Sequence, residues 1–427
     1  MTGGAHLSVT ILVTDQGCET RFSDSQTTKP LVIEGSLDSN GLTGLRRQLD
    51  RDLKKFKNLV GRELNIELPS EDLRDAMRCL FERGWLMMTS LIPVRRLSEV
   101  QDYCWNACYG PLKALPGPGA VLPVVRVETR LKSAVPVELW PLWKRSEWPP
   151  ISDASGLWDA CRMFLGFSTR VVRTLPKRVS TKAEVELLGG PLPVAHFQFA
   201  GLECVKQECA IFSGNSNVEY AGAWPAEDAA WHEEPQLVED FCSRFWDRTF
   251  RYQIQHFSCH FQSPKPLQIE NEVHLTPEIL SEESYLLLSW DGQERVKVRM
   301  RDIRVKFGEL LNGSPWPASA ARPLVFVNAC GSSHIDPAGV TSFPQVVLED
   351  AGCRGFVGTE TSIADAAAAC FARYFYEALL KDRNLGQSLA EAKQALLCSH
   401  NNPLGILYTA YVDPEMRVIS QTKDGGS

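Results

Sequence analysis

The stretch of sequence that decides the fold is PLVFVNACGSS, residues 323–333. It is apolar at every position from Pro323 to Val327, without the alternation expected of a strand that has one face in water. A strand of this kind belongs to a parallel sheet covered by helices on both faces. Cys330 comes shortly after this strand in the sequence, and the small residues Gly331, Ser332 and Ser333 come after Cys330.

Further strand and helix patterns alternate around this stretch. Strands are predicted at residues 194–199, 252–257, 285–290, 296–300, 355–359 and 406–412, and helices around 237–245 and 371–379. A last helix is expected to begin at Ser388, where Glu391 completes a capping box, and to stop before Pro403. The alternation predicts an α/β domain with a mainly parallel sheet flanked by helices.

The first part of the chain has a different pattern. Residues 7–13 alternate as a strand does, and the apolar residues from Leu42 to Phe56 repeat at helical spacing. A second helix is predicted between Ser70, a capping residue, and Gly84, a helix-ending residue.

A polar and then Gly/Pro-rich stretch, residues 177–193, indicates a boundary between domains. We therefore expect an N-terminal domain over residues 1–185 and a second domain over residues 186–427.

Composition excludes several classes of function. The chain has 427 residues, with 45 Lys and Arg against 52 Asp and Glu and a net charge of −7, so neither nucleic acid nor an anionic membrane is an expected partner. The start, MTGGAHLSV, lacks the pattern of a secretory signal, and the longest apolar run, 85–94, is too short to span a bilayer. The 13 Cys are dispersed and form no CxxC pair. We expect a soluble, intracellular, cytoplasmic protein with reduced thiols.

Reactive side chains follow two of the predicted strands. The segment YQIQHFSCHF, residues 252–261, carries His256, Cys259 and His260, and Cys330 follows another strand. Because the carboxyl ends of parallel strands meet at one edge of a sheet, side chains far apart in the sequence can converge there. A Cys and a His in such an arrangement fit nucleophilic catalysis, in which a thiolate attacks and an imidazole moves the proton.

The same residues also have structural explanations. A Cys after an apolar strand is commonly a buried small hydrophobe, and a His there is commonly a satisfied core side chain. We assign His256 to structure and Cys259 and Cys353 to packing. A metal site made of His256, Cys259 and His260 lacks a fourth ligand at the spacing of zinc sites, so we predict neither a metal nor another cofactor.

Several short motifs follow one another in a characteristic order. They are HFSCH at 256–260, PLVFVNACGSS at 323–333, GFVGT at 355–359, Asp365 with the Ala-rich helix after it, and LGQSLAEAKQAL at 385–396. With them the sequence resembles the CHAT-domain peptidases, which belong with caspases and separases among the cysteine peptidases of clan CD. Weaker similarity extends upstream to PVELW at 136–140 and to residues 165–173.

The resemblance implies a fold and a set of site residues. It implies a caspase-like catalytic domain preceded by a degenerate, caspase-like or α+β N-terminal domain. It makes Cys330 the nucleophile and His260 its general acid/base. It also implies that the oxyanion is held by the backbone N–H groups of Cys330 and of Phe261, which stands where the family usually has Gly. Asp365 is expected either to select Lys or Arg before the scissile bond or to cap the helix that begins there.

The resemblance also implies a function. We expect an intracellular cysteine endopeptidase that cleaves a protein partner, such as a gasdermin-like pore former, in a prokaryotic antiviral defence or cell-death system. A separate activator protein is expected to switch it on. The alternative is a weakly active or inactive caspase-like scaffold that binds a partner, and Phe261 in place of Gly favours this alternative.

Overall fold

The computed structural model of the chain describes residues 7–25, 29–61, 63–68, 70–110, 120–129, 135–141, 148–174, 184–186, 191–226, 234–245, 252–262, 284–288, 296–311, 322–328, 343–381 and 383–419. The chain divides into two compact units. Unit 1 is Met1–Ala183 with Tyr374–Arg417, and unit 2 is Glu184–Arg373 with Val418–Ser427. The division into domains 1–185 and 186–427 stays a prediction, and the compact units differ from it because Tyr374–Arg417 joins unit 1.

The sheet of unit 1 mixes antiparallel and parallel pairs. Its strands are β1 (Leu7–Thr14), β2 (Gly17–Asp24), β3 (Leu31–Gly35), β4 (Val124–Thr129), β5 (Arg170–Thr174) and β15 (Tyr408–Tyr411). They follow one another in the order β3-β2-β1-β4-β5-β15. The pairs β1–β2 and β2–β3 are antiparallel, whereas β1–β4, β4–β5 and β5–β15 are parallel. Burial alternates along β1, which confirms the strand predicted there.

Helices of unit 1 are α1 (Ser39–Val60), α2 (Glu71–Leu91), α3 (Val94–Tyr109), α4 (Ala154–Arg162), α5 (Leu165–Ser168) and α12 (Leu385–His400), with 3-10 turns η2 (Val137–Leu139) and η5 (Pro403–Leu407). Ser70 caps α2, as expected, by accepting the N–H of Leu73 at 3.2 Å. The expected end at Gly84 is wrong, because α2 continues to Leu91. A Cβ on Gly84 would lie 1.9 Å from the Leu139 carbonyl oxygen, so this glycine serves a close approach of two backbones.

The N-terminus of α12 also differs from the prediction. Asn384, not Ser388, is the cap: its side chain accepts the N–H of Gln387 at 2.8 Å, and the Gln387 side chain accepts the N–H of Asn384 at 3.3 Å. The helix begins one turn earlier than predicted, which buries Leu385 completely. Ser388 lies inside the helix and donates its hydroxyl to the Asn384 carbonyl. The helix ends at His400, before Pro403 as predicted.

The main sheet of unit 2 is parallel throughout. Its strands are β7 (Leu192–Gln198), β8 (Val218–Trp224), β9 (Ile254–Ser258), β13 (Leu324–Asn328) and β14 (Gly355–Thr359), in the order β14-β13-β9-β7-β8. Every residue of β9, β13 and β14 is buried. Strands with no exposed face need cover on both sides, which agrees with the expectation drawn from PLVFVN.

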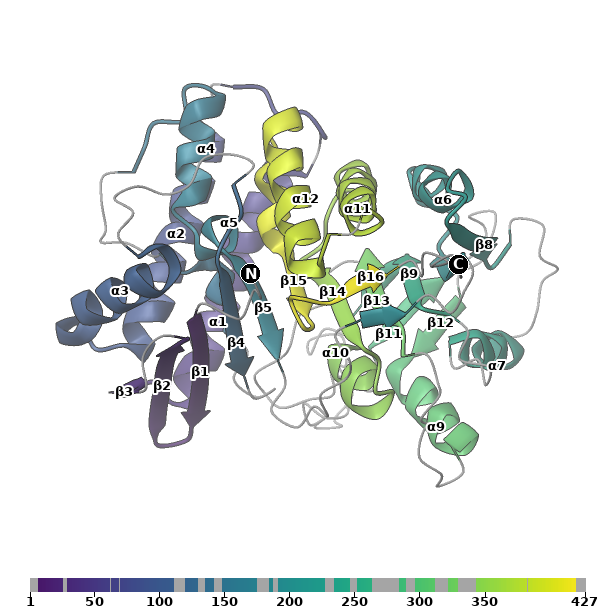
Figure 1. Cartoon of the computed structure of the whole chain (residues 1–427), viewed down its shortest axis with the longest axis horizontal. Helices are drawn as coiled ribbons and strands as arrows, with labels where there is room; N and C mark the ends of the chain where they lie inside the picture. The colour runs from purple at the N-terminus through teal and green to yellow at the C-terminus, as the bar shows by residue number, and fades with distance from the viewer. Residues whose placement is uncertain are drawn as a thin grey trace, which may run out of the picture. The chain divides into compact units, whose positions relative to one another are not determined.

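Helices and a smaller sheet complete unit 2. The helices are α6 (Val205–Ser213), α7 (Glu234–Phe245), α9 (Met300–Leu311), α10 (Phe343–Gln345) and the start of α11 (Asp365–Leu379), with a π-helical turn η4 (Val346–Asp350). A separate antiparallel sheet contains β10 (His260–Gln262), β11 (Tyr285–Leu288) and β12 (Val296–Arg299), and short strands β6 (Glu184–Glu186) and β16 (Arg417–Ile419) pair with each other. In Figure 1, α6 and α11 lie on one side of the parallel strands of unit 2 and α7 and α9 on the other. The predicted class, α/β with a mainly parallel sheet flanked by helices, is confirmed.

In the part of the chain that the structure describes, no helix combines the length and the apolar character that crossing a bilayer requires.

Candidate active site

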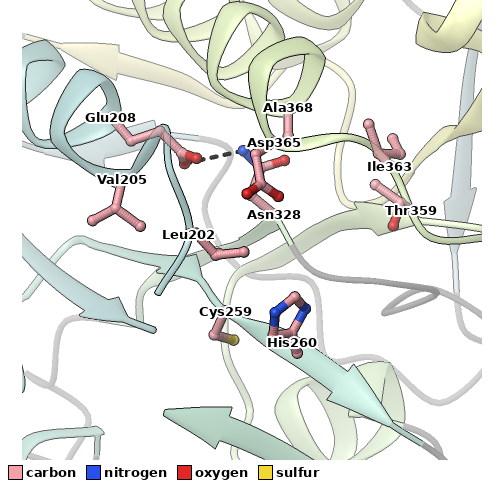
Figure 2. Close-up of a pocket in the computed structure, with 10 residues that line it drawn as sticks. All are labelled: Leu202, Val205, Glu208, Cys259, His260, Asn328, Thr359, Ile363, Asp365 and Ala368. Atoms are coloured by element: carbon pink, nitrogen blue, oxygen red, sulfur yellow. Dashed lines mark hydrogen bonds between the residues drawn. The ribbon is translucent and has the colours of Figure 1, made fainter. Parts of the chain in front are cut away.

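A pocket lies at the carboxyl ends of the parallel strands in unit 2. The residues that line it are Leu202, Val205, Glu208, Cys259, His260, Asn328, Thr359, Ile363, Asp365 and Ala368, and Figure 2 shows them. Asn328 and Thr359 are the last residues of β13 and β14, and Cys259 directly follows β9. This edge is where open α/β sheets carry their functional side chains, because the loops there are exposed while the strands stay rigid.

The predicted His260 enters the pocket from a turn between two sheets. β9 ends at Ser258, and His260 begins β10, which belongs to the smaller antiparallel sheet. The imidazole is half-buried and packs edge-on against the ring of Phe199, with the ring centres 4.9 Å apart. Cys259 is buried, in agreement with its assignment to packing.

Asp365 enters the same pocket from the opposite side, at the first residue of α11 (Figure 2). Burial raises the pKa of the Asp365 carboxyl, whereas the backbone N–H of Glu203, which it accepts, and the nearby His260 act to lower it. The structure therefore brings the predicted specificity residue and the predicted general acid/base to one pocket. Whether Asp365 selects substrates stays a prediction.

The predicted nucleophile, Cys330, lies outside the described residues. The strand that leads to it is described up to Asn328, which stands opposite Ser258 in the parallel pairing of β13 with β9. The contact between His260 and Cys330 stays a prediction.

Phe261, the residue predicted to supply an oxyanion donor, lies in the middle of β10 opposite Leu286. Its ring is buried and stacks on Phe343, with the ring centres 6.0 Å apart. Among the non-glycine residues that the structure describes, Asn401 alone has a backbone in the left-handed region. Phe261 therefore uses ordinary strand angles, and the steric reason for expecting Gly at this position does not apply to this conformation.

A buried hydrogen-bond network lies beneath the pocket, and its hub is Glu208 of α6. One carboxylate oxygen, Oε2, lies 2.5 Å from Nε2 of His256 and accepts from the hydroxyl of Ser258 at 2.8 Å and from Nδ2 of Asn328 at 3.0 Å. All of these side chains are less than one-tenth exposed. His256, assigned to structure from the sequence, is fully buried in this network.

The network continues to a second histidine on β7. Nε2 of His196 lies 2.8 Å from the Ser258 hydroxyl, and its Nδ1 lies 3.1 Å from the hydroxyl of Tyr220 and 3.7 Å from Sγ of Cys209. Burial, and then the neighbouring His256, lower the pKa of His196 well below its ordinary value. His196 is therefore neutral at pH 7 and contributes to this network through hydrogen bonds.

Glu208, Ser258 and Asn328 were not predicted from the sequence as members of a site. One pattern points to Glu208: it falls on the buried face of α6 between Val205 and Phe212, at helical spacing. A carboxylate on an apolar face indicates a buried partner, because an unpaired buried charge is costly.

Metal binding finds no support in the described ranges, which contain no group of three or more His, Cys, Asp or Glu side chains arranged to hold an ion. His256 and His260 lie on strands of different sheets.

Known proteins resemble the chain in sequence and in structure. A curated protein of Vitiosangium sp. (strain GDMCC 1.1324), named a probable protease, is 33% identical over 113 residues, which are 26% of this chain and 15% of that protein. The separase–securin complex of Saccharomyces cerevisiae matches 97% of this chain and 30% of the other chain, with a TM-score of 0.48 and 8% identity. The complex of the RgpB pro- and mature domains of Porphyromonas gingivalis matches 82% of this chain and 78% of the other chain, with a TM-score of 0.38 and 11% identity.

The family model of the CHAT domain matches residues 105–414, which make up most of the chain and include the strands that line the pocket. The chain therefore belongs to the CHAT domain family.

Proposed function

We propose that the chain is a cysteine endopeptidase in which Cys330 is the nucleophile and His260 the general acid/base. The observation that carries this proposal is the register of β9 and β13, in which Ser258 stands opposite Asn328. His260 follows Ser258 by two residues, and Cys330 follows Asn328 by the same number. The two reactive residues thus follow the paired ends of neighbouring parallel strands by the same number of residues.

Covalent geometry limits how far Cys330 lies from the pocket. Consecutive Cα atoms are 3.8 Å apart, so the Cα of Cys330 lies within about 7.6 Å of the Cα of Asn328. The Asn328 side chain lines the pocket that also holds His260. We therefore propose that the thiol of Cys330 meets the imidazole of His260 at this pocket.

The proposed chemistry is acyl transfer. His260 takes the proton of the Cys330 thiol, and the thiolate attacks the carbonyl carbon of the scissile bond. The backbone N–H groups of Cys330 and Phe261 stabilise the oxyanion. The imidazolium of His260 then protonates the leaving amine, and water hydrolyses the thioester, which returns the thiol and releases the new carboxylate.

The charge of the pocket supports a preference for basic residues. Asp365 and Glu208 both line it, and the carboxylate of Asp365 lies beside His260. A Lys or Arg side chain entering the pocket gains a charge-assisted hydrogen bond to a partly buried carboxylate, which a neutral side chain does not. Asp365 is thus proposed as the residue that selects Lys or Arg before the scissile bond.

Family membership and the similarity to a probable protease support a peptidase. The proposed substrate is a protein partner, such as a gasdermin-like pore former, in a prokaryotic defence or cell-death system. A separate activator protein is proposed to raise cleavage above the basal rate of the isolated chain, and the cytoplasm is the proposed location.

The test is a comparison of three full-length proteins on a peptide library prepared from a digested proteome, with new N-termini identified by mass spectrometry. The wild type and Cys79→Ala, which removes an exposed thiol in unit 1, are expected to cleave after Lys or Arg. Cys330→Ala is expected not to cleave. Cleavage that survives Cys330→Ala would remove Cys330 as the nucleophile, and no cleavage by any of the proteins would favour the inactive scaffold.

A further inference from the structure

We propose that Glu208 is a positioning residue that holds the ends of β9 and β13, the strands that lead along the chain to His260 and Cys330, at a fixed spacing. This inference rests on the proposed function. It concerns a residue that faces the pocket but contacts the strands rather than the reacting atoms.

A single oxygen atom joins the two strands. Oε2 of Glu208 binds Ser258, the last residue of β9, and Asn328, the last residue of β13, at 2.8 and 3.0 Å. It also binds His256, which lies on the same face of β9 as Ser258, at 2.5 Å. The hydrogen bond between Glu208 and Asn328 is drawn in Figure 2.

These contacts meet at the points where the chain leaves the sheet. After Ser258 the chain passes Cys259 and begins β10 with His260. The backbone of Ser258 is also held, because its carbonyl accepts the N–H of Phe199 at 2.8 Å. Because Ser258 is held through both its side chain and its backbone, the direction of the chain from Ser258 to His260 has little freedom.

Burial explains why a carboxylate serves here. Glu208 is 3% exposed, so water does not replace it as an acceptor for the donors around it. A carboxylate accepts several hydrogen bonds without donating one, and its charge strengthens each of them. Glu208 also lies in the first turn of α6, where the helix favours a negative charge.

A purely structural role for Glu208 makes a different prediction. If the network only stabilises unit 2, removing the carboxylate lowers thermal stability and leaves the reactivity of Cys330 unchanged in the folded protein. If the network sets the spacing of the two strand ends, the same change also separates the imidazole from the thiol. Displacement of a reacting group by about 1 Å costs on the order of 100-fold in rate.

The experiment measures alkylation of Cys330 by iodoacetamide in the full-length protein, from pH 5 to pH 10, with the labelled peptide quantified by mass spectrometry. The proteins are the wild type, His260→Ala, Glu208→Ala and Glu208→Gln. The matched control is Glu138→Gln, which removes a buried carboxylate in unit 1. Circular dichroism and thermal unfolding confirm that each protein is folded at the temperature of the assay.

We expect the wild type and Glu138→Gln to react rapidly well below the ordinary thiol pKa, which is about 8.5. Glu208→Ala is expected to behave like His260→Ala, with its midpoint moved towards that ordinary value. A thiol with a pKa of about 8.5 is only about 3% thiolate at pH 7, so the rate at pH 7 falls by up to about 30-fold. Glu208→Gln keeps one acceptor oxygen of the same reach and should lie between the two.

The outcomes separate this inference from the proposed function. A shifted profile in the wild type that His260→Ala abolishes and Glu208→Ala leaves unchanged overturns the positioning role and spares the peptidase. An ordinary thiol profile in the wild type overturns both. If Glu208→Ala does not fold, Glu208→Gln and Ser258→Ala decide, because each weakens part of the network, and unchanged profiles in both refute the inference.

Discussion

Lys393 lies in unit 1 next to a pair of buried, oppositely charged side chains. Arg173 and Glu138 form a two-point ion pair, with nitrogen–oxygen distances of 3.1 and 2.5 Å, and Arg173 also donates to the hydroxyl of Tyr411 at 2.9 Å. The ammonium of Lys393 donates to the carbonyl of Gly166 at 3.3 Å. Lys393 is 6% exposed. Lys393, Arg173 and Glu138 together therefore carry one uncompensated positive charge away from water.

Replacing Lys393 by Met should therefore stabilise the protein at neutral pH. Burial lowers the pKa of Lys393 from 10.5 to about 8, with Glu138 opposing and Arg173 adding to the shift. At about 1.4 kcal/mol per pH unit, keeping this ammonium in the folded state costs about 3 kcal/mol. Loss of the hydrogen bond to Gly166 reduces the gain in the free energy of unfolding by about 1 kcal/mol. The expected net gain in the free energy of unfolding is about 2 kcal/mol at pH 7.

The stability difference between Lys393→Met and the wild type should depend on pH. Above pH 10.5 Lys393 is neutral in both states, and between about pH 8 and pH 10.5 the unfolded state binds a proton that the folded state does not. The wild type therefore loses stability through Lys393 as the pH falls through this window, and below about pH 8 the loss is constant. The advantage of Lys393→Met should be full at pH 7 and should shrink towards pH 10.5.

Urea unfolding of both proteins between pH 7 and pH 10.5 measures this advantage. The difference between the two proteins isolates Lys393, because burial also raises the pKa of thiols such as Cys104 and Cys161, and these titrate in both proteins. A difference that does not change with pH, or a variant less stable than the wild type at pH 7, would refute the reasoning.

Other predictions concern the pocket and two helices. Asp365→Asn should lower the preference for Lys or Arg over neutral residues on the order of tenfold in the peptide library, and an unchanged preference would show that Asp365 is not the selector. Gly84→Ala should destabilise the protein by about 1–3 kcal/mol in urea unfolding, because the added Cβ meets the Leu139 carbonyl, and equal stability would contradict this close approach. Asn384→Ala should cost about 1 kcal/mol through loss of the α12 cap, whereas Ser388→Ala should cost less, and the reverse order would favour the predicted cap over the observed one.

Elements with strong local patterns could be predicted from the sequence. β13 was predicted as a doubly covered strand because its residues are apolar throughout, and the whole strand is buried. The beginning of α12 could not be predicted, because Asn384-x-x-Gln387 and Ser388-x-x-Glu391 both have the form of a capping box. Burial of Leu385, a tertiary effect, decides between them.

Residues of the candidate site also differ in whether local sequence pattern predicts them. His260 and Asp365 were predicted from motifs next to them in the chain, and the structure brings both to one pocket. The Glu208 network was not predictable from local pattern, because Glu208 lies 48 residues from His256 and 120 from Asn328 in the sequence. Only the folded sheet brings these side chains to one oxygen atom.

The proximity of Cys330 to His260 is tested most directly by cross-linking with 1,3-dibromoacetone, which alkylates a thiol and then a neighbouring nucleophile through a short bridge. Peptide mapping by mass spectrometry should find Cys330 joined to His260 in the wild type, and Cys330 modified without this partner in His260→Ala. A wild-type protein in which Cys330 is alkylated but joined to a different residue, or to none, would contradict the proposed catalytic pair.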